Sequence, residues 1–348
     1  MLQILRPDAT IAPDHESDVD LGADELLELY RLMTLSRRID TEGANLQRQG
    51  QLGLWVPLLG EEATQVGSAY ALERDDWLFF YGREHAAGLA RGIKPAELAH
   101  VWRGTWHGGL WDFRERGVAP YTIPIGTQVP HAVGFALGAK LDGANKVVLV
   151  YTGDGATSTG DFHAGATMAG VWKVPVVIVI RNNQYAISVP LSKQTAAPTL
   201  SSKAIGYGFP GMRVDGNDVL AVYVASRAAV NRARDGDGAT LIEAVTFRRG
   251  AHSTADDASR YRSEEEVKHW EALDPVDRFE RFLTNDGTLS AKRKAAIADE
   301  ADAAAAELRE AIIDAPPPDP AMLLEHVYEQ PTPNLQRQQE QLRRESDG

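Results

Sequence analysis

Four short runs of apolar residues in the middle of the chain have the pattern of buried β-strands. The second and third are continuously apolar and rich in β-branched residues, as is typical of strands covered on both faces of a parallel sheet. The alternation of these runs with helical segments predicts an α/β fold, with a parallel sheet flanked by helices. The runs lie at 77–81, 146–151, 175–180 and 241–247, and the helical segments between them lie at about 127–140, 160–173 and 217–235.

The first part of the chain is expected to be an arm followed by helices. Residues 1–23 are polar and interrupted by prolines, which indicates an irregular N-terminal arm. Apolar residues recur at helical spacing between Asp24 and Gln49, and a second helix is expected at about 60–72. We therefore place the start of the α/β domain at residue 24.

The last part of the chain is expected to be a helical extension. Residues 264–283 and 290–314 are helical in pattern with interleaved charges, and the proline-rich segment 316–320 stops any helix. We expect one more helix, docked on the body, at 322–328 and a frayed tail. The α/β domain then covers residues 24–262, and the helical C-terminal region with its tail covers residues 263–348.

Glycine and polar residues follow each predicted strand. In an open parallel sheet, ligands bind in the crevice outside the carboxyl ends of the strands. Residues of this kind at four strand ends therefore indicate the rim of an active site. The segments are Gly82-Arg83-Glu84-His85, Gly153-Asp154-Gly155, Arg181-Asn182-Asn183 and Arg248-Arg249-Gly250-Ala251-His252.

Composition excludes several classes of protein. The 348 residues include 36 Lys or Arg and 49 Asp or Glu, a formal net charge of −13, and no cysteine. The lack of cysteine excludes a thiolate nucleophile and a cysteine-based metal centre. The acidic balance argues against a nucleic-acid partner, and no apolar run approaches the roughly 20 residues that cross a membrane. No signal peptide is evident, so we expect a cytoplasmic protein.

The segment Gly153-Asp154-Gly155 predicts a phosphate site that includes a metal ion. Ser158 stands where the dinucleotide fingerprint needs glycine, and the Gly-Lys-Ser/Thr of a Walker loop is absent. The two glycines allow the backbone to approach an anion, and the next helix begins with free N–H groups. An aspartate among these donors is compatible with phosphate only if a divalent cation bridges them. The amide oxygen of Asn183, at the next strand end, is a suitable second ligand.

These residues resemble a known motif. Gly153-Asp154-Gly155 followed by Asn182-Asn183 resembles the thiamine-diphosphate motif, and the wider sequence is similar to the E1 α subunit of 2-oxo acid dehydrogenase complexes. The resemblance extends from about Leu26 to Tyr328. It is carried by residues 60–62, 151–162, 181–188, 211–218 and 249–262.

The resemblance implies a site for thiamine diphosphate and Mg²⁺ in a thiamine-diphosphate-binding fold. Asp154, Asn183 and the backbone carbonyl of Tyr185 would be the Mg²⁺ ligands. Arg83, Arg181 and His252 would contact the diphosphate, together with the loop of Gly153, Gly155 and Ala156, and Ile125 would lie against the aminopyrimidine ring. His252 is also the candidate catalytic residue, and no chemistry is assigned to His107, His131 or His163.

The family usually has tyrosine directly before the arginine that corresponds to Arg83, whereas this chain has Tyr81-Gly82-Arg83. Either Tyr81 reaches over the glycine or one phosphate hydrogen bond is missing. Ser253 matches a position that is phosphorylated in mitochondrial relatives, and by default we treat it as an ordinary loop serine.

The resemblance also implies partners. A carboxylic acid must protonate the cofactor ring, and the family carries it on a second module for which this chain has no room. Glu61 and Glu62 are not taken as substitutes, because they stand at a predicted helix start, where carboxylates are favourable anyway. We expect an E1 β subunit to supply the acid in an α2β2 heterotetramer, and the lipoyl domain of E2 to accept the acyl group.

The substrate would be a small 2-oxo acid, and the sequence leaves pyruvate and a branched-chain 2-oxo acid open. Two other functions compete with this one. One is a non-catalytic scaffold subunit with the same fold, which the intact site residues disfavour. The other is a nicotinamide-dependent oxidoreductase, which the broken dinucleotide fingerprint disfavours.

Overall fold

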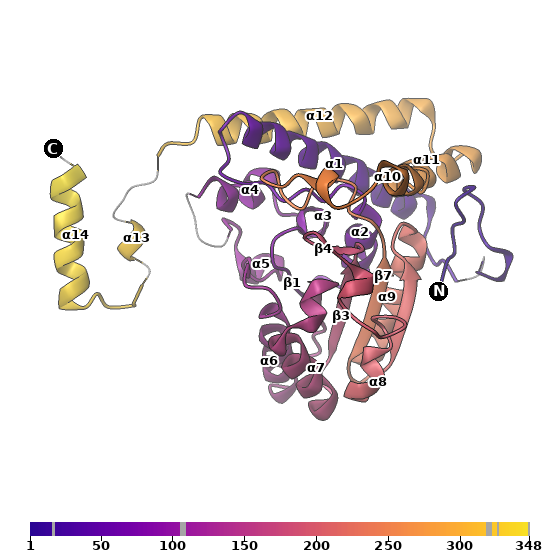
Figure 1. Cartoon of the computed structure of the whole chain (residues 1–348), viewed down its shortest axis with the longest axis horizontal. Coiled ribbons are helices and arrows are strands. Elements are labelled where there is room, and N and C mark those ends of the chain that lie inside the picture. Colours follow the sequence, from indigo (N-terminus) through magenta and orange to yellow (C-terminus); the bar gives the residue numbers. More distant parts are fainter. Residues whose placement is uncertain (16–17, 105–108, 318–321, 326, 347–348) are drawn as a thin grey trace.

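The computed structural model describes residues 1–348 with the exception of 16–17, 105–108, 318–321, 326 and 347–348 (Figure 1). Its centre is a sheet of five parallel strands, which confirms the predicted fold class. One strand at the edge was not predicted, because it is short, begins with glycine and is only partly buried. The order across the sheet is β1 (Trp77–Phe79), β2 (Val148–Gly153), β3 (Val176–Asn182), β7 (Thr240–Val245) and β6 (Gly211–Asp215).

Helices cover both faces of this sheet. Along β2, Leu149 and Tyr151 belong to the hydrophobic cluster that includes α9, whereas Val148 and Val150 belong to the one that includes α6 and α7. The continuous apolar runs in the sequence follow from this two-sided burial. The helices are α6 (Gln128–Leu141) and α7 (Gly160–Trp172) on one face and α2 (Glu62–Tyr70) and α9 (Val219–Arg234) on the other.

Two long helices run side by side beyond the carboxyl edge of the sheet (Figure 1). They are α1 (Ala23–Arg48) and α12 (Ala291–Ile313). The remaining elements of the body are α3 (His85–Ala90), α4 (Pro95–Arg103), α5 (Phe113–Arg116), α8 (Lys203–Tyr207) and the hairpin of β4 (Tyr185–Ala186) and β5 (Val189–Pro190). Among the described residues, no helix is long and apolar enough to cross a membrane.

The helix that was expected at 264–283 is two helices, α10 (Glu264–Glu271) and α11 (Pro275–Asn285). Pro275 lacks the N–H group that a continuous helix would need. The Asp274 carboxylate accepts a hydrogen bond from Val276 N at 2.9 Å and so caps the second helix.

The expectation of a frayed tail is wrong. After α13 (Met322–Glu325), the chain forms α14 (Pro333–Ser346), and both extend away from the body in Figure 1. Proline is favourable at the first position of a helix, and Thr332 Oγ1 accepts a hydrogen bond from Leu335 N at 3.3 Å. Residues 318–320 of the predicted helix stop lie outside the described residues.

The N-terminal arm is partly ordered as an extension of the sheet. Leu2 forms a parallel bridge with Val214 of the edge strand β6. The Asp218 carboxylate then accepts hydrogen bonds from the backbone N–H groups of Ile4 and Leu5, each at 2.6 Å. The arm therefore covers the exposed edge of the sheet. The domain boundaries at residues 24 and 263 stay predictions.

Candidate functional site

The loop after β2 places a buried carboxylate at the carboxyl edge of the sheet. Gly153 is in register with Arg181 of β3, and Asp154 leads into a single 3-10 turn, Gly155–Ser158, before α7 begins. The Asp154 carboxylate accepts a hydrogen bond from Gln194 Nε2 at 2.8 Å. Burial raises the pKa of Asp154, because its charged form is desolvated. Among the described residues, no Lys or Arg forms an ion pair with it, so a bound cation would meet an uncompensated buried acid.

The loop after β3 lies directly against this loop. A Cβ atom on Gly155 would lie only 2.5 Å from the Cβ of Ala186, so only glycine allows the two loops to approach this closely. Asn183, just before the β4 strand, is buried. The structure thus brings the predicted Asp154 and Asn183 loops together, and their shared coordination of one ion stays a proposal.

Arg248, to which the sequence analysis gave no role, holds the hairpin that follows Asn183. Its side chain is buried and donates hydrogen bonds to the carbonyl oxygens of Tyr185 at 3.2 Å and Ile187 at 2.8 Å. Ile187 has a φ of 56°, which is unfavourable for a β-branched residue and is stabilised by this contact. The sequence did contain a sign of this role, because Arg248 is the first of two arginines that follow a predicted strand. The Tyr185 carbonyl, a predicted metal ligand, is thereby fixed in place and retains a second lone pair.

Arg83 and His252, both predicted to contact a diphosphate, lie in direct contact with each other. One guanidinium nitrogen of Arg83 donates to the His252 carbonyl oxygen at 2.7 Å and lies 3.2 Å from His252 Nδ1. Another donates to the carbonyl of Pro57. Arg83 is only 2% exposed, and its Nε has no hydrogen-bond partner among the described residues. A buried cationic donor without a partner is suited to an anionic ligand.

Arg181 is ion-paired to two buried carboxylates. Its guanidinium contacts Glu61 and lies 2.6 Å from Glu84 Oε1, and all three side chains are completely buried. As the sequence indicated, Glu61 stands at the start of α2 and is its N-cap residue, but its side chain caps no backbone N–H group and instead contacts Arg181. The arginines lower the pKa of Glu61 more than burial raises it, so it is ionised.

Tyr81 lies at the Gly153 turn. Its ring centre is 5.1 Å from Cζ of Arg181, and a Cβ on Gly153 would be 3.2 Å from the Tyr81 hydroxyl oxygen. The Tyr81 side chain therefore reaches past Gly82 to the Gly153 turn, and its hydrogen bond to a phosphate stays a prediction.

The segment that contains Ile125 borders the same region. Ile123 and Ile125 are 49% and 51% exposed, so both side chains are free to contact a ligand or a second protein. A Cβ on Gly82 would lie 3.4 Å from Ile123 Cδ1, and one on Gly126 would lie 2.2 Å from Thr159 Oγ1. The segment therefore lies between the β1 end and the start of α7.

His252 is held as a neutral imidazole. Burial, with help from Arg83 and Arg248, lowers its pKa to about 4. Its backbone N–H donates to Asp256 Oδ2 at 2.8 Å, which orders the loop beyond β7. At neutral pH the ring is therefore uncharged.

Asp40 of α1 supports the Arg83 side of the site. Its carboxylate accepts hydrogen bonds from Trp55 Nε1 at 2.9 Å and from the backbone N–H groups of residues 58–59 at 3.0 and 3.2 Å. These bonds fix the turn whose Pro57 carbonyl accepts from Arg83. Burial raises the pKa of Asp40 to about 7.

The residues of the site fit a phosphate-bearing ligand with a divalent cation. The Nε atoms of Arg83, Arg181 and Arg248 are all buried without a hydrogen-bond partner among the described residues, and the Asp154 carboxylate has no cation beside it. The described residues contain no group of three His, Cys, Asp or Glu side chains that could bind a metal alone. A cation here would depend on one carboxylate, neutral oxygens and the oxygens of the ligand, as is usual for Mg²⁺.

His85 lies beneath the site in an aromatic cluster. Its ring stacks on Trp55 with centroids 4.3 Å apart. Its Nε2–H donates to the Val56 carbonyl at 3.2 Å, so Nδ1 accepts from the Tyr121 hydroxyl at 3.3 Å. Complete burial lowers the pKa of His85 to about 3.

We expect His85→Phe to reduce the acid sensitivity of the fold. Because the folded-state pKa is about 3 against 6.5 in the unfolded chain, the unfolded chain binds the extra proton and stability falls as pH drops below 6.5. At about 1.4 kcal/mol per pKa unit, this group alone removes about 2 kcal/mol between pH 6.5 and 5. Urea unfolding at pH 6.5 and pH 5 measures this loss of stability. His131→Gln, on the exposed face of α6, is the control and should keep the wild-type pH dependence. An unchanged pH dependence in His85→Phe would contradict the assignment.

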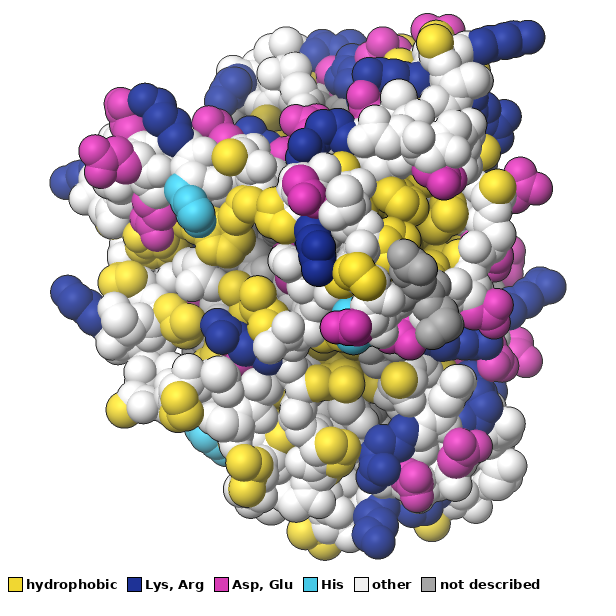
Figure 2. All heavy atoms as spheres, turned by 90° about the vertical axis from the view of Figure 1, so that its right-hand side faces the viewer, with side chains coloured by type: hydrophobic (Ala, Val, Ile, Leu, Met, Phe, Trp, Pro, Cys, Tyr) yellow, Lys and Arg dark blue, Asp and Glu magenta, His cyan; other side chains and the backbone are white. Residues whose placement is uncertain are grey.

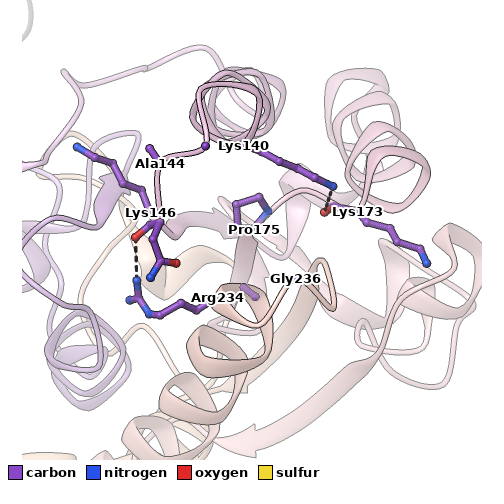
Figure 3. Close-up of a pocket in the computed structure, with 10 residues that line it drawn as sticks. Lys140, Ala144, Lys146, Lys173, Pro175, Arg234 and Gly236 are labelled. Atoms are coloured by element: carbon purple, nitrogen blue, oxygen red, sulfur yellow. Dashed lines mark hydrogen bonds between the residues drawn. The ribbon is translucent and has the colours of Figure 1, made fainter.

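A basic pocket of about 240 Å³ lies at the opposite edge of the sheet (Figure 3). Two of its cations already bind backbone carbonyls: Lys140 donates to Lys173 O at 3.0 Å, and Arg234 donates to Asn145 O at 3.1 Å. The pocket is lined by residues that precede β2, β3 and β7, so it is remote from the predicted site at the carboxyl ends of these strands. His107, which was given no chemistry, lies outside the described residues.

Comparison of the sequence with known proteins gives one family and several relatives. The family model for the dehydrogenase E1 component matches residues 30–321. A protein of Mycobacterium tuberculosis named 3-methyl-2-oxobutanoate dehydrogenase subunit alpha is 48% identical over 344 residues, which cover 99% of this chain and 94% of the relative. A Staphylococcus aureus protein named pyruvate dehydrogenase E1 component subunit alpha is 39% identical over 344 residues, or 98% of this chain and 92% of the relative.

Proposed function

The chain belongs to the dehydrogenase E1 component family, as an α-type subunit of a 2-oxo acid dehydrogenase, and we propose that it binds thiamine diphosphate through Mg²⁺ at the edge of its sheet. The family depends on thiamine diphosphate. In our proposal, Asp154, Asn183 and the Tyr185 carbonyl hold the Mg²⁺. The proposal rests on one observation. The loop after β2 lies against the loop after β3, and the first of them carries the buried carboxylate of Asp154, which forms no ion pair among the described residues.

Cationic side chains and backbone donors would bind the diphosphate. Arg83 has an unused buried donor, and Arg248 has another. Arg181 is already ion-paired to Glu61 and Glu84, so these carboxylates would partly neutralise its charge and weaken its attraction for the diphosphate. The turn of Gly153, Gly155 and Ala156 would supply close backbone contact, and Ile125 would lie against the pyrimidine ring.

The chemistry itself comes from the cofactor, which stabilises the electron pair left when CO₂ departs from a 2-oxo acid. His252 would be the catalytic residue and would act as an uncharged hydrogen-bond donor, since its pKa of about 4 keeps it unprotonated at neutral pH. Its loop would face the incoming acceptor. Among the described residues, one α/β module is present, so the acid for the cofactor ring would come from an E1 β subunit.

We propose an α2β2 heterotetramer that transfers the acyl group to a lipoyl domain of E2. Figure 2 shows several separate groups of hydrophobic side chains among charged ones on the face at the right of Figure 1. Ile123, Ile125 and Ile187, all near the site, are about half exposed as well. Exposed apolar side chains beside an incomplete site favour a protein partner there.

A branched-chain 2-oxo acid is the favoured substrate, and pyruvate is the second candidate. The favoured assignment is supported by the higher identity to the 3-methyl-2-oxobutanoate dehydrogenase subunit, 48% against 39% for the pyruvate dehydrogenase subunit. Pockets that differ by a methylene or two discriminate by roughly 10–200-fold. The family match leaves the nicotinamide-dependent alternative without support.

The test is reconstitution with a β-type subunit. We expect CO₂ release from 3-methyl-2-oxobutanoate only when both subunits, thiamine diphosphate and Mg²⁺ are present, with kcat/KM roughly tenfold or more above that for pyruvate. Either subunit alone is the control. Robust turnover by this chain alone would contradict the shared site, and an inactive pair that still binds the cofactor would favour the scaffold alternative.

A further inference from the structure

One buried carboxylate, Glu61, serves two partners at the centre of the site. Its Oε1 accepts a hydrogen bond from Asn183 Nδ2 at 2.7 Å, and its Oε2 accepts one from Arg181 Nη1. Arg83 Nε lies 3.9 Å from Oε1. Glu61 and Arg181 are completely buried and Asn183 is 5% exposed, so water does not compete for these bonds.

The chemistry of the two side chains determines which way the Asn183 amide faces. An ionised carboxylate only accepts hydrogen bonds, whereas an amide carries two donors on nitrogen and an acceptor oxygen. The nitrogen of Asn183 must therefore face Glu61, and its oxygen must face away. That oxygen has only a long contact within the chain, 3.4 Å to Tyr185 N, which leaves it a lone pair for a cation.

We propose that Glu61 is a positioning residue that presents the oxygen of Asn183, and not its nitrogen, to the divalent cation. The inference rests on the proposed function, because it assumes the cation site. It assigns Glu61 a role through Asn183, with no contact to the cation itself. An amide nitrogen carries no lone pair for a metal, so the opposite orientation would remove one ligand.

Glutamine in place of Glu61 would be a poor substitute, although it has the same shape. Glutamine has one acceptor oxygen, whereas Asn183 and Arg181 both need an acceptor. The charged guanidinium of Arg181 forms the stronger hydrogen bond and would take that oxygen. The amide nitrogen of the introduced glutamine would then face Asn183. Two amide nitrogens cannot bond each other, so Asn183 would turn round and offer its own nitrogen to the cation.

The experiment measures binding of Mn²⁺, a paramagnetic substitute for Mg²⁺, by electron paramagnetic resonance in the presence of thiamine diphosphate. The sample is the full-length chain with its β-type subunit. Loss of a residue that orients a metal ligand typically weakens metal binding by roughly 10–100-fold, and we expect this for Glu61→Gln. Glu62→Gln is the matched control: Glu62 is also completely buried and ion-paired, but to Arg37 on the α1 side. It should retain wild-type affinity.

A second variant separates orientation from a general structural role. In the double variant Glu61→Gln/Asn183→Asp, the introduced amide nitrogen can donate to one oxygen of the introduced carboxylate while the other oxygen faces the cation, and the net charge is unchanged. We expect it to bind Mn²⁺ about tenfold or more tightly than Glu61→Gln alone, as the reverse of the loss just described.

The outcomes separate the two proposals. Unchanged Mn²⁺ affinity in Glu61→Gln, or no rescue in a double variant whose circular dichroism shows it to be folded, would overturn the role of Glu61 and leave the proposed function standing. A wild-type complex that binds Mn²⁺ no better with thiamine diphosphate than without it would overturn both. Equal weakening in Glu61→Gln and Glu62→Gln would reduce Glu61 to a structural residue.

Discussion

Replacement of Asp154 by asparagine should abolish Mg²⁺-dependent binding of thiamine diphosphate while the chain stays folded. Asparagine keeps the shape of the side chain and can still bond to Gln194, whose Nε2 lies 2.8 Å from the carboxylate. It removes the only charged ligand in the proposed set. Because partners that merely orient metal ligands are worth roughly 10–100-fold in affinity, loss of the ligand itself should cost more than about 100-fold.

The same change should slightly stabilise the chain in the absence of cofactor. The pKa of Asp154 is raised by burial, which means that its ionised form costs free energy in the folded state. Calorimetric titration measures the loss of binding, and thermal unfolding without cofactor measures the gain in stability. Asp161→Asn, an exposed position in the first turn of α7, is the matched control. Unchanged affinity in Asp154→Asn would contradict the metal-ligand assignment.

Replacement of Arg181 by methionine should be among the most destabilising single changes at the site. It would leave Glu61 and Glu84 completely buried without their shared cation. Removal of one partner from a buried ion pair typically costs 3–5 kcal/mol, so we expect a loss of about 4 kcal/mol in the free energy of unfolding. Urea unfolding at neutral pH measures it.

If the lost stability comes from the unpaired charges of Glu61 and Glu84, removal of these charges should restore it. The triple variant Arg181→Met/Glu61→Gln/Glu84→Gln should recover most of the lost stability, since buried ion networks are often replaceable by neutral groups. Arg31→Met is the surface counterpart: Arg31 also pairs with two carboxylates, Glu28 and Glu300, but all three are partly exposed. It should cost less than about 1 kcal/mol. Similar losses for both arginines would show that burial is not the cause.

The sequence predicted the core of the fold because the strands there are covered on both sides. A run such as 176–180 must be apolar at every position when helices pack on each face. β6 was not predicted, because it is not covered on both sides. It lies at the sheet edge, begins at Gly211 and buries only its last two residues, so its sequence lacks a strand pattern. The break between α10 and α11 was visible at Pro275 and was overlooked.

The candidate site was predictable where chemistry and strand ends coincide. Arg83 and His252 are 169 residues apart in sequence, and both follow predicted strands, which is why their placement at the same edge of the sheet could be anticipated. Glu61 could not be assigned in the same way. A carboxylate before a helix is favourable on electrostatic grounds alone, and only the packing of α2 against the sheet edge shows that it faces Arg181. Arg248 was visible at the end of β7, but its bonds to the β4–β5 hairpin depend on the tertiary structure.

The bonds between the N-terminal arm and Asp218 also constrain the order in which the chain can fold. Ile4 and Asp218 are 214 residues apart, so during synthesis Ile4 must wait for all of the intervening chain before it can form this bond. Contacts of such long range form late and slowly. The β6 side of the molecule is therefore completed late, by residues that are made long before the strand that they cover.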